Sequence, residues 1–205
     1  IESRITRKPD FRPAEYDMEK AALIAPAVRM LLKSGDSSIV TFRTNQEVLN
    51  LVKDEASFYP VSSAYSPDHI VYCRPYALFV EASDDMETQY RLIQDGIEAY
   101  QQKNGYAPKI IAVQNLGFYA WGTNKKNADI CAEVFLDACK IGVYSEAFGG
   151  PLFMTQKMID FICNWEVESY RSKVSLAGAA ALRLQEKIAI VTGSAQGFGQ
   201  GIADE

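Results

Sequence analysis

The segment Lys187-Ile-Ala-Ile-Val-Thr-Gly-Ser-Ala-Gln-Gly-Phe-Gly199 predicts a strand, a tight turn and the first turn of a helix. Residues 188–191 form an unbroken apolar run rich in β-branched side chains, which is typical of a parallel strand buried on both faces. Gly193 suits the tight turn, while Gly197 and Gly199 lack the Cβ atoms that would keep a backbone from a phosphate or a helix from its sheet. Because the positive N-terminus of a helix attracts anions, we interpret the segment as a pyrophosphate-binding turn.

This turn resembles that of the short-chain dehydrogenases, whose Thr-Gly-x-x-x-Gly-x-Gly pattern is matched at all four fixed positions. The resemblance implies NAD or NADP as cofactor, and the candidate cofactor-binding residues are Thr192, Gly193, Ser194, Gly197, Phe198 and Gly199. It also implies an acidic residue for the ribose and a catalytic Ser, Tyr and Lys, all of which would lie beyond Glu205. We therefore expect a piece of a longer protein with no catalytic residue of its own. The alternative interpretation is a glycine-rich structural turn.

Composition argues against several classes of partner and location. The 205 residues are 48% apolar and 23% charged, which is ordinary for a globular domain. The net charge of −5 argues against a nucleic acid or an anionic membrane surface as partner. No apolar run approaches the roughly 20 residues that span a bilayer, and residues 1–7 do not form a secretory signal. We expect a cytoplasmic protein.

The cysteines and the histidine limit the metal chemistry of this chain. The cysteines are widely spread among apolar neighbours without metal-ligand spacing, at Cys73, Cys131, Cys139 and Cys163. On a shared helix Cys131 and Cys139 would lie more than about 10 Å apart, too far for a disulfide, so we expect buried, reduced thiols. An aldol or hydrolytic zinc site takes several histidines. A chain with one histidine, His69, therefore cannot assemble such a site by itself.

Helical periodicity and capping signals predict the helices upstream of the glycine turn. Pro13 suits the first turn of a helix that is kinked or restarted at Pro26 and ended by Gly35. The predicted N-terminal caps are a capping box at 44–47, Ser83 for a helix that ends at 104–105, and Thr123 for a helix with an apolar face over 128–139. A further amphipathic helix is predicted from 154 to 165, or as far as 171.

Short apolar runs predict the strands, which cover residues 39–42, 69–73, 76–81, 109–113 and 118–121. Residues 53–67 are rich in Ser, Pro and Tyr and are interpreted as a loop. Strands and helices alternate, while hairpin-like pairs interrupt the alternation. The predicted fold class is therefore α/β, as a three-layer or α/β sandwich with a mixed sheet, followed by the first strand, turn and helix of a Rossmann domain.

The order of motifs along the chain resembles the bifunctional class II aldolase/short-chain dehydrogenase family, of the rhamnulose-phosphate aldolase and lactaldehyde dehydrogenase type. The motifs, ahead of the dehydrogenase turn, are Ser66-Pro-Asp-His-Ile70, the stretch 108–122, residues 128–135 and Trp165-Glu-Val-Glu168. The resemblance implies an aldolase-like α/β domain and a divalent metal, expected to be zinc, held by histidines of an upstream half.

Two places bear on whether this domain is itself catalytic. An active class II aldolase has a His-Gly where this chain has Leu116-Gly117, so a metal ligand is missing there and we assign no metal-binding residue to the chain. Asp68 and His69 match the family pattern. We nevertheless interpret them as turn or sheet-edge hydrogen-bonding residues rather than catalytic ones.

The resemblance divides the chain into parts. Residues 1–12 are interpreted as a lead-in from an upstream domain and residues 13–150 as the aldolase-like α/β domain. Residues 151–186 form a docking helix and linker, and residues 187–205 begin the short-chain dehydrogenase domain. The docking helix could pack on either domain or on a second subunit.

Two functional hypotheses remain. In the first, the chain connects the two halves of a bifunctional enzyme of carbohydrate catabolism, a sugar-phosphate aldolase and an NAD(P)-dependent dehydrogenase. Its partners would be a sugar phosphate or aldehyde substrate and further copies of itself in a homo-oligomer. In the second, the α/β domain is a catalytically silent binding or oligomerisation module attached to a dehydrogenase. Histidines upstream of position 1 would favour the first hypothesis.

Overall fold

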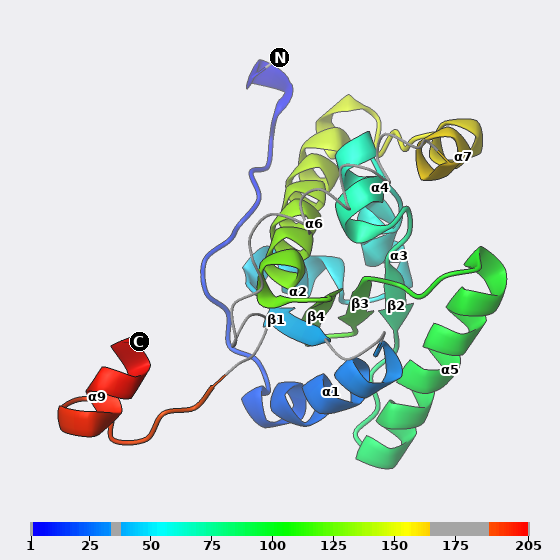
Figure 1. Ribbon diagram of the computed structural model, residues 1–205. Helices are drawn as coiled ribbons and strands as arrows, with labels where there is room; N and C mark the ends of the chain where they lie inside the picture. Colours follow the sequence, from blue (N-terminus) through cyan, green and yellow to red (C-terminus); the bar gives the residue numbers. More distant parts are fainter. Residues whose placement is uncertain (1, 34–37, 165–188, 205) are drawn as a thin grey trace.

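The computed structural model describes residues 2–33, 38–164 and 189–204. A four-stranded sheet in the order β1-β4-β3-β2 forms its centre (Figure 1). The strands are β1 (Ile39–Arg43), β2 (Leu78–Val80), β3 (Ile110–Val113) and β4 (Gly117–Gly122). β2 and β3 are parallel, whereas β3 pairs with β4 and β4 with β1 in antiparallel fashion. The sheet is therefore mixed, as the sequence predicts.

Helices cover both faces of this sheet. α6 (Lys125–Ser145) lies on one face, and α1 (Met18–Leu31) and α5 (Met86–Asn104) lie on the other (Figure 1). Alternate residues of the central strands enter two separate buried clusters. Ile110, Ala112, Phe118 and Ala120 pack on the α6 side, and Ile111, Val113 and Tyr119 pack on the α1 and α5 side. The result is a three-layer α/β/α sandwich, which confirms the predicted α/β class with its mixed sheet; the predicted start of a Rossmann domain stays a prediction.

The first long helix differs from its prediction. α1 begins at Met18, after the N-cap Asp17, rather than at Pro13, and it continues through Pro26 without a restart. An interior proline removes one backbone hydrogen bond and normally costs about 3 kcal/mol. Here the helix keeps a continuous buried stripe of Ala21, Ile24 and Val28 on both sides of the proline, which offsets that cost. The predicted end at Gly35 falls outside the described residues.

The predicted strand over 69–73 is wrong. These residues belong to the helix α4 (Pro67–Cys73), with Pro67 in its first turn and Ser66 at the N-cap position. A short apolar run does not distinguish a buried strand from a buried helical turn. His69, Ile70 and Cys73 are buried because three- and four-residue spacing places them on one face of the helix. The following strand, predicted over 76–81, is confined to β2.

Several helix starts are shifted from their predicted caps. Asn45, Asp85 and Asn124 cap α2 (Gln46–Leu51), α5 and α6, instead of Thr44, Ser83 and Thr123. In each case the Asn or Asp oxygen accepts a hydrogen bond from a backbone N–H three residues later. The predicted loop over 53–67 also contains α3 (Glu55–Phe58) and the 3-10 helix η2 (Tyr59–Val61).

The docking helix packs on the α/β domain. α7 (Gln156–Asn164) follows the 3-10 helix η3 (Glu146–Phe148) and the break at Gly149 and Gly150, and its buried residues are Ile159 and Ile162. They pack against Ala64 and Ile70, so α7 contacts α4. Packing of α7 on a dehydrogenase domain or on a second subunit stays a prediction. The predicted linker after it lies outside the described residues.

Candidate functional site

The glycine turn and the helix after it have the geometry that a close backbone approach requires. Residues 192–196 form the turn, and α9 (Gly197–Asp204) begins directly afterwards. Gly193 and Gly197 have φ angles of 66° and 62°, in the left-handed region that favours glycine. A Cβ atom on Gly199 would lie 2.4 Å from the carbonyl oxygen of Gly193. The three glycines are thus each required by the local backbone.

The structure places all six predicted cofactor-binding residues on this one turn and the start of α9. Thr192, Ser194 and Phe198 are exposed, and the Phe198 side chain is 96% accessible. Whether they hold a cofactor stays a prediction. The strand predicted before the turn is not formed over 189–191, and Ile190 is exposed. Since no described strand lies beside these residues, their backbone lacks the sheet partners that a strand needs.

A second candidate site is a small cavity between α4, α6 and β3. His69 is its notable polar residue, and Cys73, Arg74, Ile110 and Phe135 are among its other lining residues. We call it the α4 cavity. The His69 side chain is 94% buried, as its 6% exposure shows. Its Nδ1 lies 2.9 Å from Ser66 Oγ, and its Nε2 is buried without a hydrogen-bond partner among the described residues.

The surroundings keep this histidine neutral. Burial lowers the pKa of His69, and the negative charges of Asp137 and Asp68 oppose that shift only in part. A neutral imidazole has one donor and one acceptor nitrogen. The Ser66 contact uses Nδ1, so Nε2 is free to donate or to accept, depending on the tautomer. The prediction of a turn or sheet-edge role for His69 was wrong in its location, because the residue lies within a helix.

Arg74, at the C-terminal end of α4, has an unusual backbone. Its φ of 69° and ψ of 159° fall in a region that is essentially restricted to glycine and costs an ordinary residue about 1–3 kcal/mol. Its guanidinium carbon lies 4.6 Å from the centre of the Tyr106 ring, a cation–π contact. Sequence reasoning missed this residue. The only available signal was that Arg74 precedes a proline, which restricts the backbone of the residue before it.

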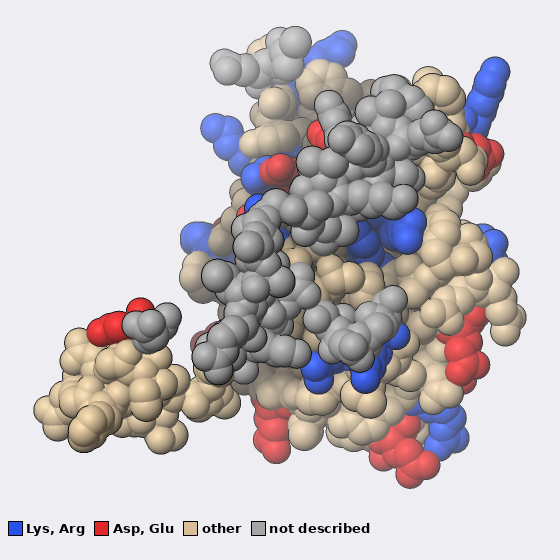
Figure 2. Space-filling model, viewed as in Figure 1, with Lys and Arg blue, Asp and Glu red and all other residues tan. Residues whose placement is uncertain are grey.

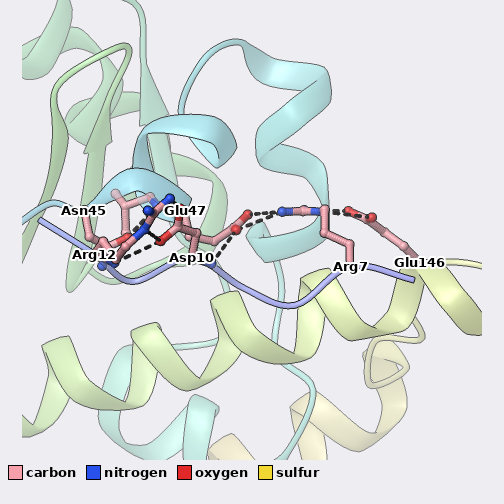
Figure 3. A network of polar contacts seen from close by, with 7 residues as sticks. Arg7, Asp10, Arg12, Asn45, Glu47 and Glu146 are labelled. Carbon is pink, nitrogen blue, oxygen red and sulfur yellow. Dashed lines mark hydrogen bonds and ion pairs between the residues drawn. The ribbon is translucent and has the colours of Figure 1, made fainter. Parts of the chain in front are cut away.

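An ionic cluster around the buried carboxylate of Glu47 joins the beginning of the chain to the domain (Figure 3). Arg7 lies between two carboxylates, with its Nη1 2.8 Å from both oxygens of Glu47 and its Nη2 3.0 Å from Glu146. Glu47 also accepts the backbone N–H of Asp10 at 3.0 Å. The sequence suggested a capping-box role for Glu47. The structure instead uses this carboxylate to hold residues 7–10, so the cluster has a structural role.

The place where the family pattern has a histidine is part of the apolar core. Leu116 lies in the turn between β3 and β4 and is 2% exposed, packed in the cluster under α1 and α5. Gly117 follows with a φ of 148°, and a Cβ atom there would lie 2.7 Å from the carbonyl oxygen of Arg43. Leu116 therefore packs the core while Gly117 allows the turn to approach β1.

Among the described residues, no group of three His, Cys, Asp or Glu side chains lies close enough to bind a metal ion. Cys73, Cys131 and Cys139 are buried free thiols, as predicted, but Cys163 is exposed. The Cys73 thiol lies 3.2 Å from the carbonyl oxygen of Cys131. Its pKa is raised, first by the contact with Cys131 and then by burial, so the thiol is protonated at neutral pH.

Charges of both signs are interspersed on the face shown in Figure 2, rather than gathered into a stripe of one sign. None of the described helices combines the length and the apolar character that crossing a membrane would require.

Comparison with known proteins shows the fold. No protein-family model matches the chain, and no curated protein sequence is similar to it. An aldolase II superfamily protein from Pseudomonas syringae has a similar structure, with a TM-score of 0.51 and 12% identity over 78% of this chain and 62% of that chain. YgbL from Escherichia coli gives a TM-score of 0.47 and 14% identity, over 70% of this chain and 64% of that one.

The first of these likenesses shows that the α/β domain has an aldolase-like fold, which the sequence resemblance implied. At 12% identity it shows the fold alone. This chain spans less than two thirds of the length of either protein, at 62% and 64%.

Proposed function

We propose that this chain connects the two halves of a bifunctional enzyme of carbohydrate catabolism. One half is a metal-dependent sugar-phosphate aldolase, and the other is a short-chain dehydrogenase that uses NAD or NADP. Residues 13–150 form the aldolase-like domain, and residues 187–205 begin the dehydrogenase domain.

The observation that supports the dehydrogenase part best is the glycine turn. Gly193 and Gly197 occupy left-handed backbone positions, and Gly199 lies where a side chain would collide with Gly193. Because these glycines carry no side chains, cofactor phosphates could approach the backbone at the start of α9. There the N-terminus of the helix favours negative charge. These residues would bind the cofactor. The nicotinamide supplies hydride chemistry when it is bound, and the proton-transferring residues would lie beyond Glu205.

The aldolase part is supported by the fold and by the order of the sequence motifs. The chain has one histidine, which leaves the zinc-binding histidines to an upstream half. The α/β domain would then act as scaffold between the two sites. We also propose a cytoplasmic homo-oligomer whose substrates are a sugar phosphate and the aldehyde that its cleavage releases.

The alternative proposal is a catalytically silent module attached to a dehydrogenase. It is favoured by one observation, the burial of Leu116 in an apolar core at the place where the family pattern has a metal ligand. In that case the domain would contribute binding or oligomerisation only.

The experiment is the isolation of the natural protein that contains this sequence, followed by measurement of its intact mass, metal content and NAD(P)H formation with short aldehydes. The proposal expects several hundred further residues, bound zinc and both activities. A metal-free enzyme with dehydrogenase activity alone would support the silent module. A protein that binds neither NAD nor NADP would rule out both proposals.

The 205-residue chain alone provides the complementary test. Because it holds only the beginning of a cofactor site, we expect calorimetry to show no tight NAD or NADP binding. Micromolar affinity would contradict the view that the site is completed by residues beyond Glu205.

A further inference from the structure

The outer face of α1 carries apolar side chains, where a helix at a protein surface is normally polar. Met18, Leu23 and Met30 are 69%, 47% and 64% exposed. Ala22 and Pro26 are exposed as well, and with the two methionines they form a row with four-residue spacing along the helix. We call this row together with Leu23 the α1 stripe. A contiguous exposed apolar face of this kind is typical of an interaction surface.

The opposite side of α1 is already used by the domain. Ala21, Ile24 and Val28 are buried, and the helix contacts β1, β4 and α5. Figure 1 shows α1 along the lower side of the sandwich, and the exposure of its outer residues shows that no described element covers them. The α1 stripe is therefore not part of the core of the domain.

Charged residues flank the α1 stripe. Glu19 lies in the first turn of α1 and Arg29 in its last turn, while Glu15 lies just before the helix and Lys33 just after it. All four residues are exposed. Within the described residues none of them forms an ion pair. Acidic side chains thus stand at one end of the stripe and basic side chains at the other.

Positions at equal distances from residue 24 carry matching side chains, which are either both apolar or of opposite charge. The pairs are Met18 with Met30, Ala22 with Pro26, Glu19 with Arg29, and Glu15 with Lys33. At 3.6 residues per turn, the midpoints of the three pairs within the helix point in one outward direction, so a single two-fold axis relates them. In a two-fold interface each residue meets its pair-mate in the other copy. Two antiparallel α1 helices would therefore match at every pair.

We propose that the α1 stripe binds a second copy of this chain, with the two α1 helices antiparallel about a two-fold axis. Ala22 and Pro26 lie nearest this axis, where their small side chains let the helices approach. Met18 and Met30 pack at the two ends, where their flexible side chains adapt to the partner. This contact would build the homo-oligomer of the proposed function, on which the inference rests, and it uses neither the aldolase nor the cofactor site.

One helix from each copy makes a small interface. α1 has 14 residues and is about 21 Å long, so the buried area should not exceed the low end of specific interfaces, about 1,200 Å². We therefore expect a reversible dimer with a micromolar dissociation constant. Since its ion pairs lie at the rim of the contact, the dimer should weaken as the salt concentration rises.

The test is sedimentation velocity of the 205-residue chain over a range of concentrations, with charge-reversal variants. Glu19→Arg and Arg29→Glu each place like charges opposite one another twice in the dimer, so each should weaken dimerisation at least about tenfold. An equal mixture of the two variants should restore the affinity to within about threefold, because each reversed residue then meets an opposite charge. The two positions are about 15 Å apart along one helix, so restoration on mixing identifies a contact between chains.

A pair of methionine variants tests the apolar part of the contact. Met30→Gln should weaken the dimer at least about tenfold, since the two-fold axis places this residue in the interface twice. Met158→Gln is the matched control, because Met158 is 54% exposed on α7 and lies outside the α1 stripe. It should leave dimerisation unchanged. A larger effect of Met158→Gln than of Met30→Gln would place the contact on another face.

Circular dichroism checks that the variants fold. Arg29 Nε donates a hydrogen bond to the Ser38 carbonyl oxygen. Should Arg29→Glu fail to fold, Glu15→Lys and Lys33→Glu form the second complementary pair, tested alone and mixed in the same way. A chain that stays monomeric up to about 1 mM, a dimer that is insensitive to charge reversal, or variants that do not associate on mixing would overturn the proposal.

The oligomer test is independent of the enzyme proposal, because sedimentation requires neither zinc nor NAD(P). A monomeric chain whose natural parent protein shows both activities would remove the α1 interface alone. A dimer that responds to the variants as expected, from a parent protein without either activity, would remove the enzyme proposal and leave the interface.

Discussion

Arg7 Nη1 lies 2.8 Å from both carboxylate oxygens of Glu47, whose side chain is fully buried. The same guanidinium contacts Glu146 beyond the end of α6, and the backbone around Asp10 bonds to the start of α2. The first residues of the chain are thus fixed to two helices that are distant in sequence. A buried carboxylate depends on such a partner, because its desolvation is otherwise uncompensated.

Arg7→Ala should lower the free energy of unfolding by about 2 kcal/mol, measured by urea denaturation. Loss of one partner of a buried ion pair costs about 3–5 kcal/mol, and the exposed fraction of Arg7 reduces the effect here. Arg12→Ala is the matched control, since Arg12 is exposed and pairs with Asp10 on the surface; its effect on the free energy of unfolding should be much smaller than that of Arg7→Ala. Equal effects of the two variants would show that burial of Glu47 does not decide the outcome.

These contacts illustrate what sequence reasoning could reach. The layers were predictable, because the runs at 110–113 and 117–122 and the periodicity of α5 are local signals. The ion pair between Arg7 and Glu47 was not predictable, since the two residues are 40 positions apart and no local sequence signal marks them as partners. α4 was missed for a related reason: burial of one face of a short helix gives an apolar run like that of a strand. At the glycine turn, the need for glycine was predictable from the local pattern. The strand before the turn was not, because a strand forms only beside hydrogen-bonding strands from elsewhere in the protein.

Acidification should destabilise the chain through His69. Burial lowers its pKa in the folded state below the ordinary value of about 6.5, so the unfolded chain binds the proton more readily. The contribution of neutral His69 to the free energy of unfolding is therefore fully present above about pH 7. It falls as the pH drops toward about 5, by at most about 1.4 kcal/mol per pH unit. Urea midpoints measured across this range should decline.

His69→Gln provides the control for this pH effect. Whatever its stability at pH 7, the variant should lose the decline between about pH 7 and pH 5, since the chain has no other histidine. Asp10, Asp54, Asp85 and Asp129, whose pKa values are lowered, lose their contributions only at more acidic pH. A decline of the same size in both proteins would assign it to other groups.

Two glycines of the sandwich should respond to alanine in opposite directions. Gly96 lies inside α5, where an added Cβ would touch Leu78 and Val80 at 3.6 Å, an ordinary contact. Gly96→Ala should therefore stabilise the chain by about 0.5–1 kcal/mol through helix propensity. At Gly122 the added Cβ would lie 2.4 Å from the backbone nitrogen of Ala128, so Gly122→Ala should cost about 3 kcal/mol. Thermal unfolding of both variants measures this, and a stable Gly122→Ala protein would contradict the close packing of α6 on β4.

The glycine turn offers a matched pair for the cofactor prediction. A Cβ at Gly199 would lie 2.4 Å from the Gly193 carbonyl oxygen, whereas a Cβ at Gly201, two residues further along α9, would meet open space. Neither residue has a positive φ, so backbone conformation does not separate them. In the natural protein that contains this sequence, Gly199→Ala should weaken NAD(P) binding at least about tenfold, because the turn must open, while Gly201→Ala should keep it.

Stability has to be followed in the same two variants, since a structural turn would also be sensitive to Gly199→Ala. If the turn binds phosphates, the loss in cofactor affinity should exceed any loss in the thermal stability of the cofactor-free protein, and saturating NAD(P) should stabilise Gly201→Ala far more than Gly199→Ala. Should Gly199→Ala lower the stability of the free protein while cofactor affinity is retained, the glycines serve the fold of the turn alone, and the cofactor is bound elsewhere.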